Sequence, residues 1–564
     1  MAALFLTGVG IAAMQPAMAQ DPLPGEQLPS LPAIDRTLAT LHGVVRNSAT
    51  GEGVPRALVS IQGDASAGAL TDGDGRFEIP GLPVGPQAVE VRKPGFLDQT
   101  NSAVYDATAS GLPHNVLLAA DMADVEFTLS PTCTIRGQIE LSTGDPAEGI
   151  EVGLARRTVA NGRAIWQASG FAHTRSDGKY RFGGLADGAY ALYTEPSMDS
   201  EAAANLVQPG AKAAERWGYA SVYYPDARDP SGAAKITVAS GEEAQANLTL
   251  TREPFQTVTA NVVPAQAGMN YSALVMDGAG RQLRYGAQYD QNSHTIQAAL
   301  PDGSYSMLVS SAPQFDQAGR GGGAGVLVGT VDFSVAGHAV TNLRVPLTTP
   351  RPSSVQVNVV RSGAGKGAGQ IGEVLVMVNR AGGWIDDGMA SVYASGTPPA
   401  PLPATYTLPG AYWADVQLAE QGLCEGSFTA GGANLAREPV AIGLSGSTAP
   451  MELTLRDDCA QLNLSLPEDV AGMAAGEERY YTAWVVPDFD FTRELYPVVL
   501  RPTSGGTVLL NNMTPGNYHV YTFAGPVRLE YRNRTALAAL PDAGQVVTLS
   551  PSETTNLVVE APEP

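Results

Sequence analysis

Apolar and polar residues alternate over short segments along the whole chain, and turn-forming residues separate these segments. In the segment Thr71–Val91, Phe77 and Ile79 fall on one face of a strand, because successive side chains of a strand point to opposite faces. Asp-Gly pairs precede this strand, and a turn rich in Gly and Pro follows it before Val89 and Val91 alternate again. The pattern predicts a β-hairpin.

The same hairpin returns 103 positions later. Six residues of the first copy match six residues of the second at this constant offset, which indicates a duplicated unit. The matching pairs are Gly75 and Gly178, Phe77 and Tyr180, Ile79 and Phe182, Gly81 and Gly184, Leu82 and Leu185, and Gly85 and Gly188.

Weaker copies of the unit follow, each marked by an apolar residue, a turn, Gly, any residue and then Tyr. These tyrosines are Tyr190, Tyr305, Tyr412 and Tyr518, and Gln87 occupies the place in the first copy. Together with the recurring terminal strands, they predict modules of sandwich size. The expected modules are 39–131, 132–252 with an insertion at 201–229, 253–349, 350–457 and 458–562, and residues 201–207 have some helical character.

Long helical periodicity is absent, since no segment keeps apolar residues at helical spacing beyond about twelve positions without Gly or Pro. A parallel sheet flanked by helices is therefore disfavoured. Strands that alternate in this way must bury one face against a second sheet. We expect an all-β fold: a tandem array of about five β-sandwich modules of immunoglobulin-like or transthyretin-like type.

The charge of the chain narrows the choice of partners. Its formal net charge is −22, with 34 basic residues among 564. Binding to a phosphate backbone requires clustered Lys and Arg, so we expect neither nucleic acid nor an anionic membrane surface as partner. Strong acidity favours a soluble exported surface.

The first residues have the pattern of an export signal. An apolar run is followed by Ala17-Met18-Ala19, which is typical of a signal-peptidase site, so we expect a signal peptide at 1–19 and a Pro-rich linker at 20–38. No later segment reaches the about eighteen apolar residues of a membrane helix. The prediction is an exported protein, periplasmic, on the outer surface or secreted, without a membrane span in the mature chain.

Three cysteines are too few for a disulfide-dense scaffold. Cys424 and Cys459 are 35 positions apart and could pair in an oxidising compartment, where closing that loop contributes about 4 kcal/mol on the chain-entropy model. The alternative is two separate buried thiols. Cys133 is then left over, and a buried structural thiol is favoured over a nucleophile because no basic neighbourhood accompanies it.

The segment Gly43–Val91 resembles a known family. Its Gly-x-Val start, its Pro55-x-Ala57 second strand and its Thr71-Asp-x-x-Gly-x-Phe turn are similar to the carboxypeptidase regulatory-like domain. The resemblance implies a transthyretin-like β-sandwich, related in shape to carbohydrate-binding-like folds. The second module matches less completely, and the two together resemble parts of large exported bacterial proteins.

The family name suggests a search for peptidase chemistry. A zinc peptidase needs closely spaced His and Glu ligands, and none of the six histidines has Glu at +3 or His at +4. Gly443-Leu-Ser445-Gly-Ser lacks the final Gly of a nucleophile elbow. Asp72-Gly-Asp74-Gly resembles the start of a calcium loop without the remaining ligands, and a hairpin turn is favoured over weak calcium binding. We expect no enzyme activity, metal or cofactor.

Aromatic residues are the remaining candidates for a binding site. Trp217, Tyr219, Tyr223 and Tyr224 lie close together in the insertion, and exposed aromatic faces stack well on sugar rings. The alternative is that they pack the insertion onto its sandwich. Tyr412-Trp413 and Trp384 are candidates for a second site.

Two functions follow from these features. The first is binding or structural spacing at the cell envelope or outside the cell, with an extracellular or envelope protein as partner. The second is polysaccharide binding through the aromatic residues of the insertion.

Overall fold

The computed structural model describes most of the chain between residues 37 and 562. The described ranges are 37–98, 113–199, 216–265, 269–277, 282–311, 326–361, 372–382, 384–385, 391–405, 407–418, 422–468, 470, 476–477, 480–502 and 505–562. The predicted signal peptide, the predicted linker up to residue 36 and the stretch 201–207 lie outside these ranges.

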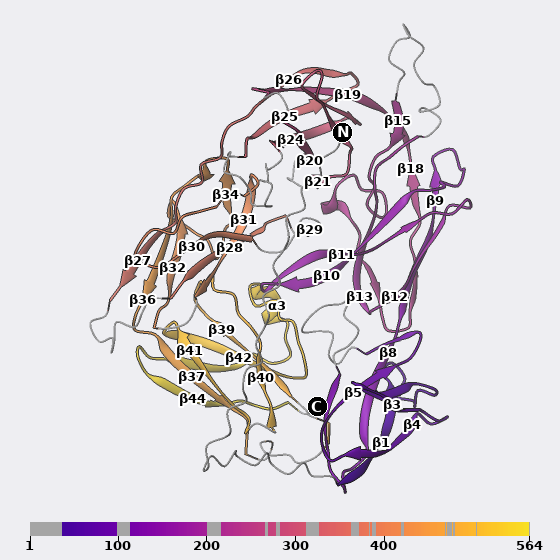
Figure 1. Ribbon diagram of the computed structural model, residues 1–564, viewed down its shortest axis with the longest axis vertical. Coiled ribbons are helices and arrows are strands. Elements are labelled where there is room, and N and C mark those ends of the chain that lie inside the picture. Colours follow the sequence, from indigo (N-terminus) through magenta and orange to yellow (C-terminus); the bar gives the residue numbers. More distant parts are fainter. Residues whose placement is uncertain are drawn as a thin grey trace, which may run out of the picture.

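The described chain is almost entirely β-structure, which confirms the predicted fold class. Five separate clusters of buried apolar side chains, here called the cores of modules one to five, follow one another along the chain. Each core lies between two sheets. Figure 1 shows the five modules arranged around a closed path, so that the fifth lies beside the first.

In module one, the first strand is central to its sheet. It pairs antiparallel with the first strand of the predicted hairpin and parallel with the last strand of the module. The strands are β1 (Leu38–Asn47), β2 (Leu58–Ile61), β3 (Asp64–Leu70), β4 (Arg76–Pro83), β5 (Gly85–Arg92), β6 (Phe96–Leu97), β7 (His114–Leu118) and β8 (Val125–Pro131).

Module two repeats this plan. Its first strand, β9, pairs antiparallel with β12 on one side and parallel with β17 and then β18 on the other. Its elements are β9 (Cys133–Leu141), β10 (Glu151–Ala160), β11 (Arg163–His173), β12 (Lys179–Leu185), β13 (Gly188–Thr194), β14 (Ser197–Met198), β15 (Arg216–Tyr219), η1 (Pro230–Gly232), β16 (Ile236–Val238), β17 (Glu243–Gln245) and β18 (Leu248–Leu250).

In module three, the first strand again pairs antiparallel with the strand before the Gly-x-Tyr turn and parallel with the last strand. Its strands are β19 (Arg252–Val263), β20 (Tyr271–Asp277), β21 (Gln282–Leu283), β22 (Ala287–Asp290), β23 (Thr295–Leu300), β24 (Gly303–Ser311), β25 (Val328–Val335) and β26 (Val340–Pro346). Strand β15 from the module-two insertion pairs with β19, so the insertion extends a sheet of module three.

Module four departs from the plan, because its last strand is the central one and pairs with both the first strand and β32. Its strands are β27 (Gln356–Val360), β28 (Val374–Arg380), β29 (Trp384–Ile385), β30 (Ser391–Gly396), β31 (Gly410–Leu418), β32 (Cys424–Ala430), β33 (Ala433–Asn434), β34 (Val440–Gly443), β35 (Gly446–Ser447) and β36 (Met451–Arg456).

Module five returns to the common plan and adds a short helix. Its elements are β37 (Ala460–Ser465), β38 (Gly476–Glu477), β39 (Tyr481–Pro487), β40 (Val498–Leu500), β41 (Thr507–Met513), β42 (Gly516–Ala524), α3 (Arg534–Ala538), β43 (Gln545–Leu549) and β44 (Thr554–Val558).

The repeated sequence features have direct structural causes. Gly75 and Gly178 have φ values of 78° and 73°, which side-chain-bearing residues rarely adopt. Gly43 and Gly137 each face the backbone carbonyl of the neighbouring last strand, where a Cβ atom would collide with the oxygen. The glycines of the motif therefore permit the tight turn before β4 and β12 and the close pairing of the first and last strands. The prediction of a β-hairpin is wrong, because β4 pairs with β1 whereas β5 pairs with β2 and β7, so the two strands lie in different sheets. The same holds for β12 and β13 of the second copy.

The recurring tyrosine bonds back to the turn before its own strand. In each copy, the hydroxyl donates to the carbonyl oxygen four residues earlier, at 2.6 Å for Tyr190, Tyr412 and Tyr518 and 3.0 Å for Tyr305. Gln87 of module one does the same with its Nε2, at 2.7 Å from the carbonyl oxygen of Pro83. The sequence pattern therefore marks a contact that recurs in all five modules, including the one without Tyr.

Two contacts far apart in the sequence close the path. Strand β38 of module five pairs antiparallel with β7 of module one. The long hairpin of β10 and β11 leaves module two and reaches toward helix α3 of module five (Figure 1), and β11 also pairs with β29 of module four. The modules of the tandem array therefore contact not only their neighbours in the sequence but also modules that are distant in the sequence.

Candidate functional site

The tip of the β10–β11 hairpin meets modules four and five at a buried carboxylate. Asp415 of β31 is 1% exposed, and its Oδ1 accepts a hydrogen bond from Nη2 of Arg532 at 2.7 Å. Its Oδ2 accepts from the side-chain amides of Asn161 in the hairpin and Asn379 in module four, both at 3.1 Å. One carboxylate thus joins three modules.

Arg532 completes this junction. Besides Asp415, its guanidinium donates to four backbone carbonyl oxygens, so its hydrogen-bonding capacity is largely used. These acceptors are Asn161 at 3.1 Å, Phe491 at 3.0 Å, Thr492 at 2.8 Å and Arg493 at 3.3 Å. Its backbone N–H donates to the carbonyl of Gly162, which has a φ of 70° and lies against the ring of Tyr531.

Arg163 lies beside the junction and covers an aromatic ring. Its guanidinium carbon is 4.0 Å from the ring centroid of Trp413, and its Nη1 is 3.8 Å from Oδ1 of Asp415. Burial, together with the positive charge of Arg532, lowers the pKa of Arg163 to about 10. The side chain therefore remains charged at neutral pH.

A second buried carboxylate fixes module four to module five. Glu425 of β32 is 5% exposed, and its Oε1 accepts from the backbone N–H and the hydroxyl of Thr492, both at 2.7 Å. Its Oε2 accepts from the backbone N–H of Arg493 at 2.7 Å. Burial raises the pKa of Glu425, and these three donors oppose the rise because they favour the charged form.

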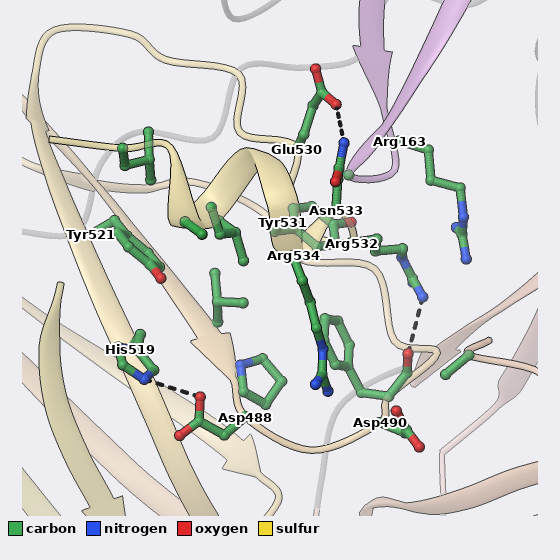
Figure 2. Close-up of a pocket in the computed structure, with 18 of the residues that line it drawn as sticks. Arg163, Asp488, Asp490, His519, Tyr521, Glu530, Tyr531, Arg532, Asn533 and Arg534 are labelled. Carbon is green, nitrogen blue, oxygen red and sulfur yellow. Dashed lines mark hydrogen bonds and ion pairs between the residues drawn. The ribbon is translucent and has the colours of Figure 1, made fainter. Parts of the chain in front are cut away.

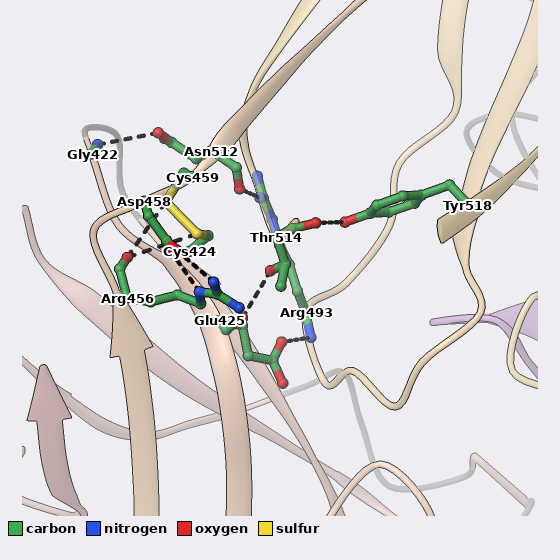
Figure 3. The surroundings of a disulfide bond; sticks show 10 residues. All are labelled: Gly422, Cys424, Glu425, Arg456, Asp458, Cys459, Arg493, Asn512, Thr514 and Tyr518. Carbon is green, nitrogen blue, oxygen red and sulfur yellow. Dashed lines mark hydrogen bonds and ion pairs between the residues drawn. A yellow bond between two sulfur atoms is a disulfide. The ribbon is translucent and has the colours of Figure 1, made fainter. Parts of the chain in front are cut away.

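The disulfide lies next to this contact. Cys424 and Cys459 are joined, with their Cα atoms 5.7 Å apart, as shown in Figure 3. Cys424 begins β32 of module four, whereas Cys459 immediately precedes β37 of module five. The bond therefore crosses the junction between the two modules. Cys133 is a buried free thiol that donates to the carbonyl of Ala239, and burial raises the pKa of Cys133.

An open cleft of about 1340 Å³ adjoins the three-module junction. Module five supplies most of its wall, and the hairpin tip and module four supply the rest (Figure 2). Its aromatic lining residues are Trp413, Phe489, Phe491, Tyr521 and Tyr531, and its charged or titratable ones are Arg163, Arg437, Asp488, Asp490, His519, Glu530, Arg532 and Arg534.

The acidic groups of this cleft already have partners. Asp490 accepts from Arg437 at 3.0 Å and from Asn434 at 3.0 Å, so module four holds it in place. Glu530 pairs with Arg157 of the hairpin at 2.6 Å. Asp488 lies 3.1 Å from Nε2 of His519. The negative charges of the cleft are therefore offset by neighbouring side chains.

The aromatic residues proposed from the insertion do not form a common exposed surface. Tyr223 is fully buried and stacks on Tyr193 with ring centroids 5.7 Å apart, so its ring lies inside the module. Tyr219 and Tyr224 are half-buried and pack against the module-two core. Trp217 is half-buried beneath Arg252, whose guanidinium carbon is 5.0 Å from its ring centroid. These contacts match the packing alternative.

The residues of the second aromatic candidate, Tyr412, Trp413 and Trp384, do not share one surface either. Tyr412 is buried in the module-four core, whereas Trp413, the next residue on the strand, faces the cleft. The side chain of Trp384 lies outside the described residues. Of the aromatic candidates, Trp413 is thus one that the structure places in a cleft.

The Asp-Gly-Asp-Gly segment forms a turn. Oδ1 of Asp72 accepts from the backbone N–H groups of Asp74 and Arg76, at 2.9 and 2.8 Å. Within the described ranges, no group of three His, Cys, Asp or Glu side chains is placed to hold a metal ion. In the same part of the chain, no helix is long and apolar enough to cross a membrane.

The model of the carboxypeptidase regulatory-like domain matches residues 40–119, which confirms the resemblance seen in module one. No curated protein matches the chain.

Several solved structures are similar in fold. The Bacillus anthracis TIE protein is 12% identical, covers 75% of this chain and 74% of its own, and has a TM-score of 0.17. A streptococcal ancillary pilin is 10% identical over 55% of this chain and 99% of its own, with a TM-score of 0.19. The major pilin subunit of Bacillus cereus is 6% identical over 76% and 98%, with a TM-score of 0.13.

The sequence analysis missed the junction residues and most of the cleft. Asp415 and Arg532 are 117 positions apart and belong to no repeated motif. Two signals were present. Asn161-Gly162-Arg163 is a polar turn in a hairpin longer than its counterparts, and Tyr531-Arg532-Asn533-Arg534 concentrates two cations in an acidic chain.

Proposed function

We propose that the chain is an exported, non-catalytic protein that acts in binding or as a structural element at the cell envelope or outside the cell. Its five modules work as one closed body rather than as a flexible string. The observation that carries this proposal is the junction of Asp415 with Arg532 and Asn161, which joins modules two, four and five through buried groups.

The energetics support a closed body. Asp415 and Arg532 have side-chain exposures of 1% and 5%, so solvent screens their attraction little. Separating the modules would return both charges to water but would also break the hydrogen bonds of Asn161 in the hairpin, which its side chain makes to Asp415 and its carbonyl oxygen accepts from Arg532. The strand pairing of β38 with β7 and the disulfide at Cys424 hold the path at two further places.

The disulfide and the predicted signal peptide support this compartment. Structural disulfides persist in oxidising compartments and are rare in the cytosol, so the Cys424–Cys459 bond supports export. The net charge of −22 favours a soluble surface that does not bind anionic polymers indiscriminately. The expected partner is an extracellular or envelope protein.

Two measurements test the proposal. Small-angle scattering of the purified full chain should match the profile calculated from the closed arrangement, and the profile of an extended string would refute the closed body. Cell fractionation of the full-length protein should place it outside the cytoplasm, with Cys424 and Cys459 protected from thiol reagents until reduction. A cytoplasmic protein with three reactive thiols after unfolding would refute export.

Carbohydrate binding through the insertion is the weaker candidate. Tyr219 and Tyr224 pack against the module-two core, and Arg252 lies over the ring of Trp217. If the insertion binds sugar, Trp217→Ala should abolish quenching of Trp fluorescence by oligosaccharides; quenching that persists in this variant would refute the candidate.

A further inference from the structure

The cleft beside the junction contains two cations, Arg534 and Arg163, whose hydrogen-bonding capacity is used little by the protein. Arg534 on helix α3 is exposed, and none of the other described residues forms a hydrogen bond or ion pair with its guanidinium. Figure 2 shows its side chain extending from the helix into the cleft. Arg163 makes one long ion pair, at 3.8 Å, and otherwise lies against Trp413.

These two arginines differ from the others around the cleft. Arg532 donates to Asp415 and to backbone carbonyls, and Arg437 is paired with Asp490. A guanidinium presents a planar fork of donors that matches a carboxylate, and such charge-assisted bonds are among the stronger ones in proteins. Arg163 and Arg534 are therefore placed to receive oxyanions from outside the chain.

The remaining lining suits a ligand that has both ring faces and polar edges. Trp413, Phe489 and Phe491 are half-buried and contribute apolar ring surface. Asp488 and His519 add polar groups that are 47% and 28% exposed. Sugar rings combine apolar C–H faces with hydroxyl edges, and both find partners in a lining of this composition.

An extended peptide is disfavoured as the ligand of the cleft, because strand β42 has no free edge with which it could pair. Strand β42, which carries His519 and Tyr521 to the cleft, is paired on both edges, with β39 and β43. An extended peptide gains much of its affinity from main-chain bonds to a free strand edge, and β42 offers none. A ligand in this cleft is therefore held mainly by side chains.

The charge of the whole chain limits how acidic the ligand can be. A net charge of −22 repels a densely charged polyanion at long range. A ligand with carboxylates separated by neutral rings would meet Arg163 and Arg534 with less repulsion. The cleft volume of about 1340 Å³ exceeds the about 300–1,000 Å³ of common small-molecule sites, which leaves room for several rings.

We propose that this cleft binds an acidic oligosaccharide in which carboxylate-bearing sugars are separated by neutral ones, with Arg534 and Arg163 holding the carboxylates and Trp413 contacting a ring. This inference rests on the proposed binding function and supplies its ligand class. It uses a different part of the chain from the aromatic residues of the insertion.

The test is calorimetric titration of the full chain with a hyaluronan tetrasaccharide, which alternates glucuronate with N-acetylglucosamine. Its methyl ester has the same rings without the charges and serves as the matched ligand. We expect the acid to bind about a hundred-fold more tightly than the ester, because the acid makes two charge-assisted contacts and each contributes roughly ten-fold. Equal binding of acid and ester, or no binding of either, would overturn the proposal.

Two variants place the site. Arg534→Gln should weaken binding of the acid about ten-fold and leave binding of the ester unchanged. Arg175→Gln removes an exposed arginine of module two that does not line the cleft, and it should leave both affinities unchanged. If both variants weaken binding equally, the effect is one of overall charge and the site is wrong.

A third ligand separates the proposal from a protein partner. A peptide with spaced glutamates carries the same carboxylates without sugar rings, and we expect it to bind less tightly than the tetrasaccharide. Tighter binding of the peptide would overturn the oligosaccharide assignment in favour of a protein. None of these results affects the scattering profile, so failure of the ligand assignment is distinguishable from failure of the closed body.

Discussion

Replacement of Asp415 by Ala tests how strongly the closed path is held. Asp415 is 1% exposed and accepts three hydrogen bonds, from Arg532, Asn161 and Asn379. The variant leaves the guanidinium of Arg532 buried without its counter-ion. Removing one partner of a buried ion pair costs about 3–5 kcal/mol, and we expect the lower end, about 3 kcal/mol, because Arg532 keeps its four backbone acceptors.

The measurement is urea-induced unfolding followed by both tryptophan fluorescence and scattering. A chain of five cores need not unfold in one step, so the midpoint of the transition that includes module five is compared rather than a global free energy. The exposed pair of Asp124 with Arg76 provides the control, and Asp124→Ala should change stability by no more than about 0.5 kcal/mol.

A double-mutant cycle distinguishes the ion pair from simple loss of packing. Arg532→Met removes the charge that Asp415→Ala leaves unpaired, so the double variant should be less destabilised than the sum of the two single ones. Additive effects, or an Asp415→Ala protein with unchanged midpoint and scattering profile, would refute the idea that this buried pair holds modules two, four and five together.

Three further predictions concern the other contacts. Cys424→Ser should lower the stability of the junction between modules four and five by about 4 kcal/mol, and reduction of the wild type should lower the same unfolding midpoint. Because burial raises the pKa of Glu425, the folded state holds its proton more tightly than the unfolded chain does. Stability should therefore fall as pH rises from about 4.5 through the raised pKa. Glu425→Gln should reduce this dependence of the unfolding midpoint on pH. Tyr518→Phe removes the hydrogen bond to the turn and should lower the free energy of unfolding by about 1 kcal/mol in chemical unfolding. Gln87→Tyr, which introduces the tyrosine of the other modules, should change stability by less than that. A larger effect of Gln87→Tyr than of Tyr518→Phe would contradict the shared role of this contact.

The sequence predicts the modules well because their determinants are local. Alternation places Phe77 and Ile79 in a core, and a glycine with positive φ is required at Gly75 whatever the rest of the chain does. Duplication then repeats these local signals, so the strands of later modules follow from the first. The bond from Gln87 to Pro83 shows the limit of this approach, because a shared contact survived a change of residue type that pattern matching counts as a loss.

The closed path could not be predicted in the same way. Asp415 lies on a strand between apolar neighbours, and nothing local distinguishes a buried acid from a solvated one. Its burial depends on Arg532 and on a hairpin tip more than 250 positions earlier in the chain. Polar contacts between modules carry no periodicity, so their partners become visible only in three dimensions.

The distribution of positive charge gives the junctions a common physical basis. The chain is acidic overall, so its modules repel one another, yet arginines pair repeatedly with acids of a neighbouring or distant module. These pairs are Arg157 with Glu530, Arg228 with Glu253, Arg284 with Glu151 and Glu195, Arg437 with Asp490, and Arg532 with Asp415. Exposed pairs contribute little energy each, about 0–1 kcal/mol, so their main effect is to offset repulsion where modules approach. The buried pair of Arg532 and Asp415 differs, because both side chains also bond to Asn161 at the hairpin tip. This pair therefore determines which modules contact one another, whereas the exposed pairs only reduce the repulsion between acidic modules.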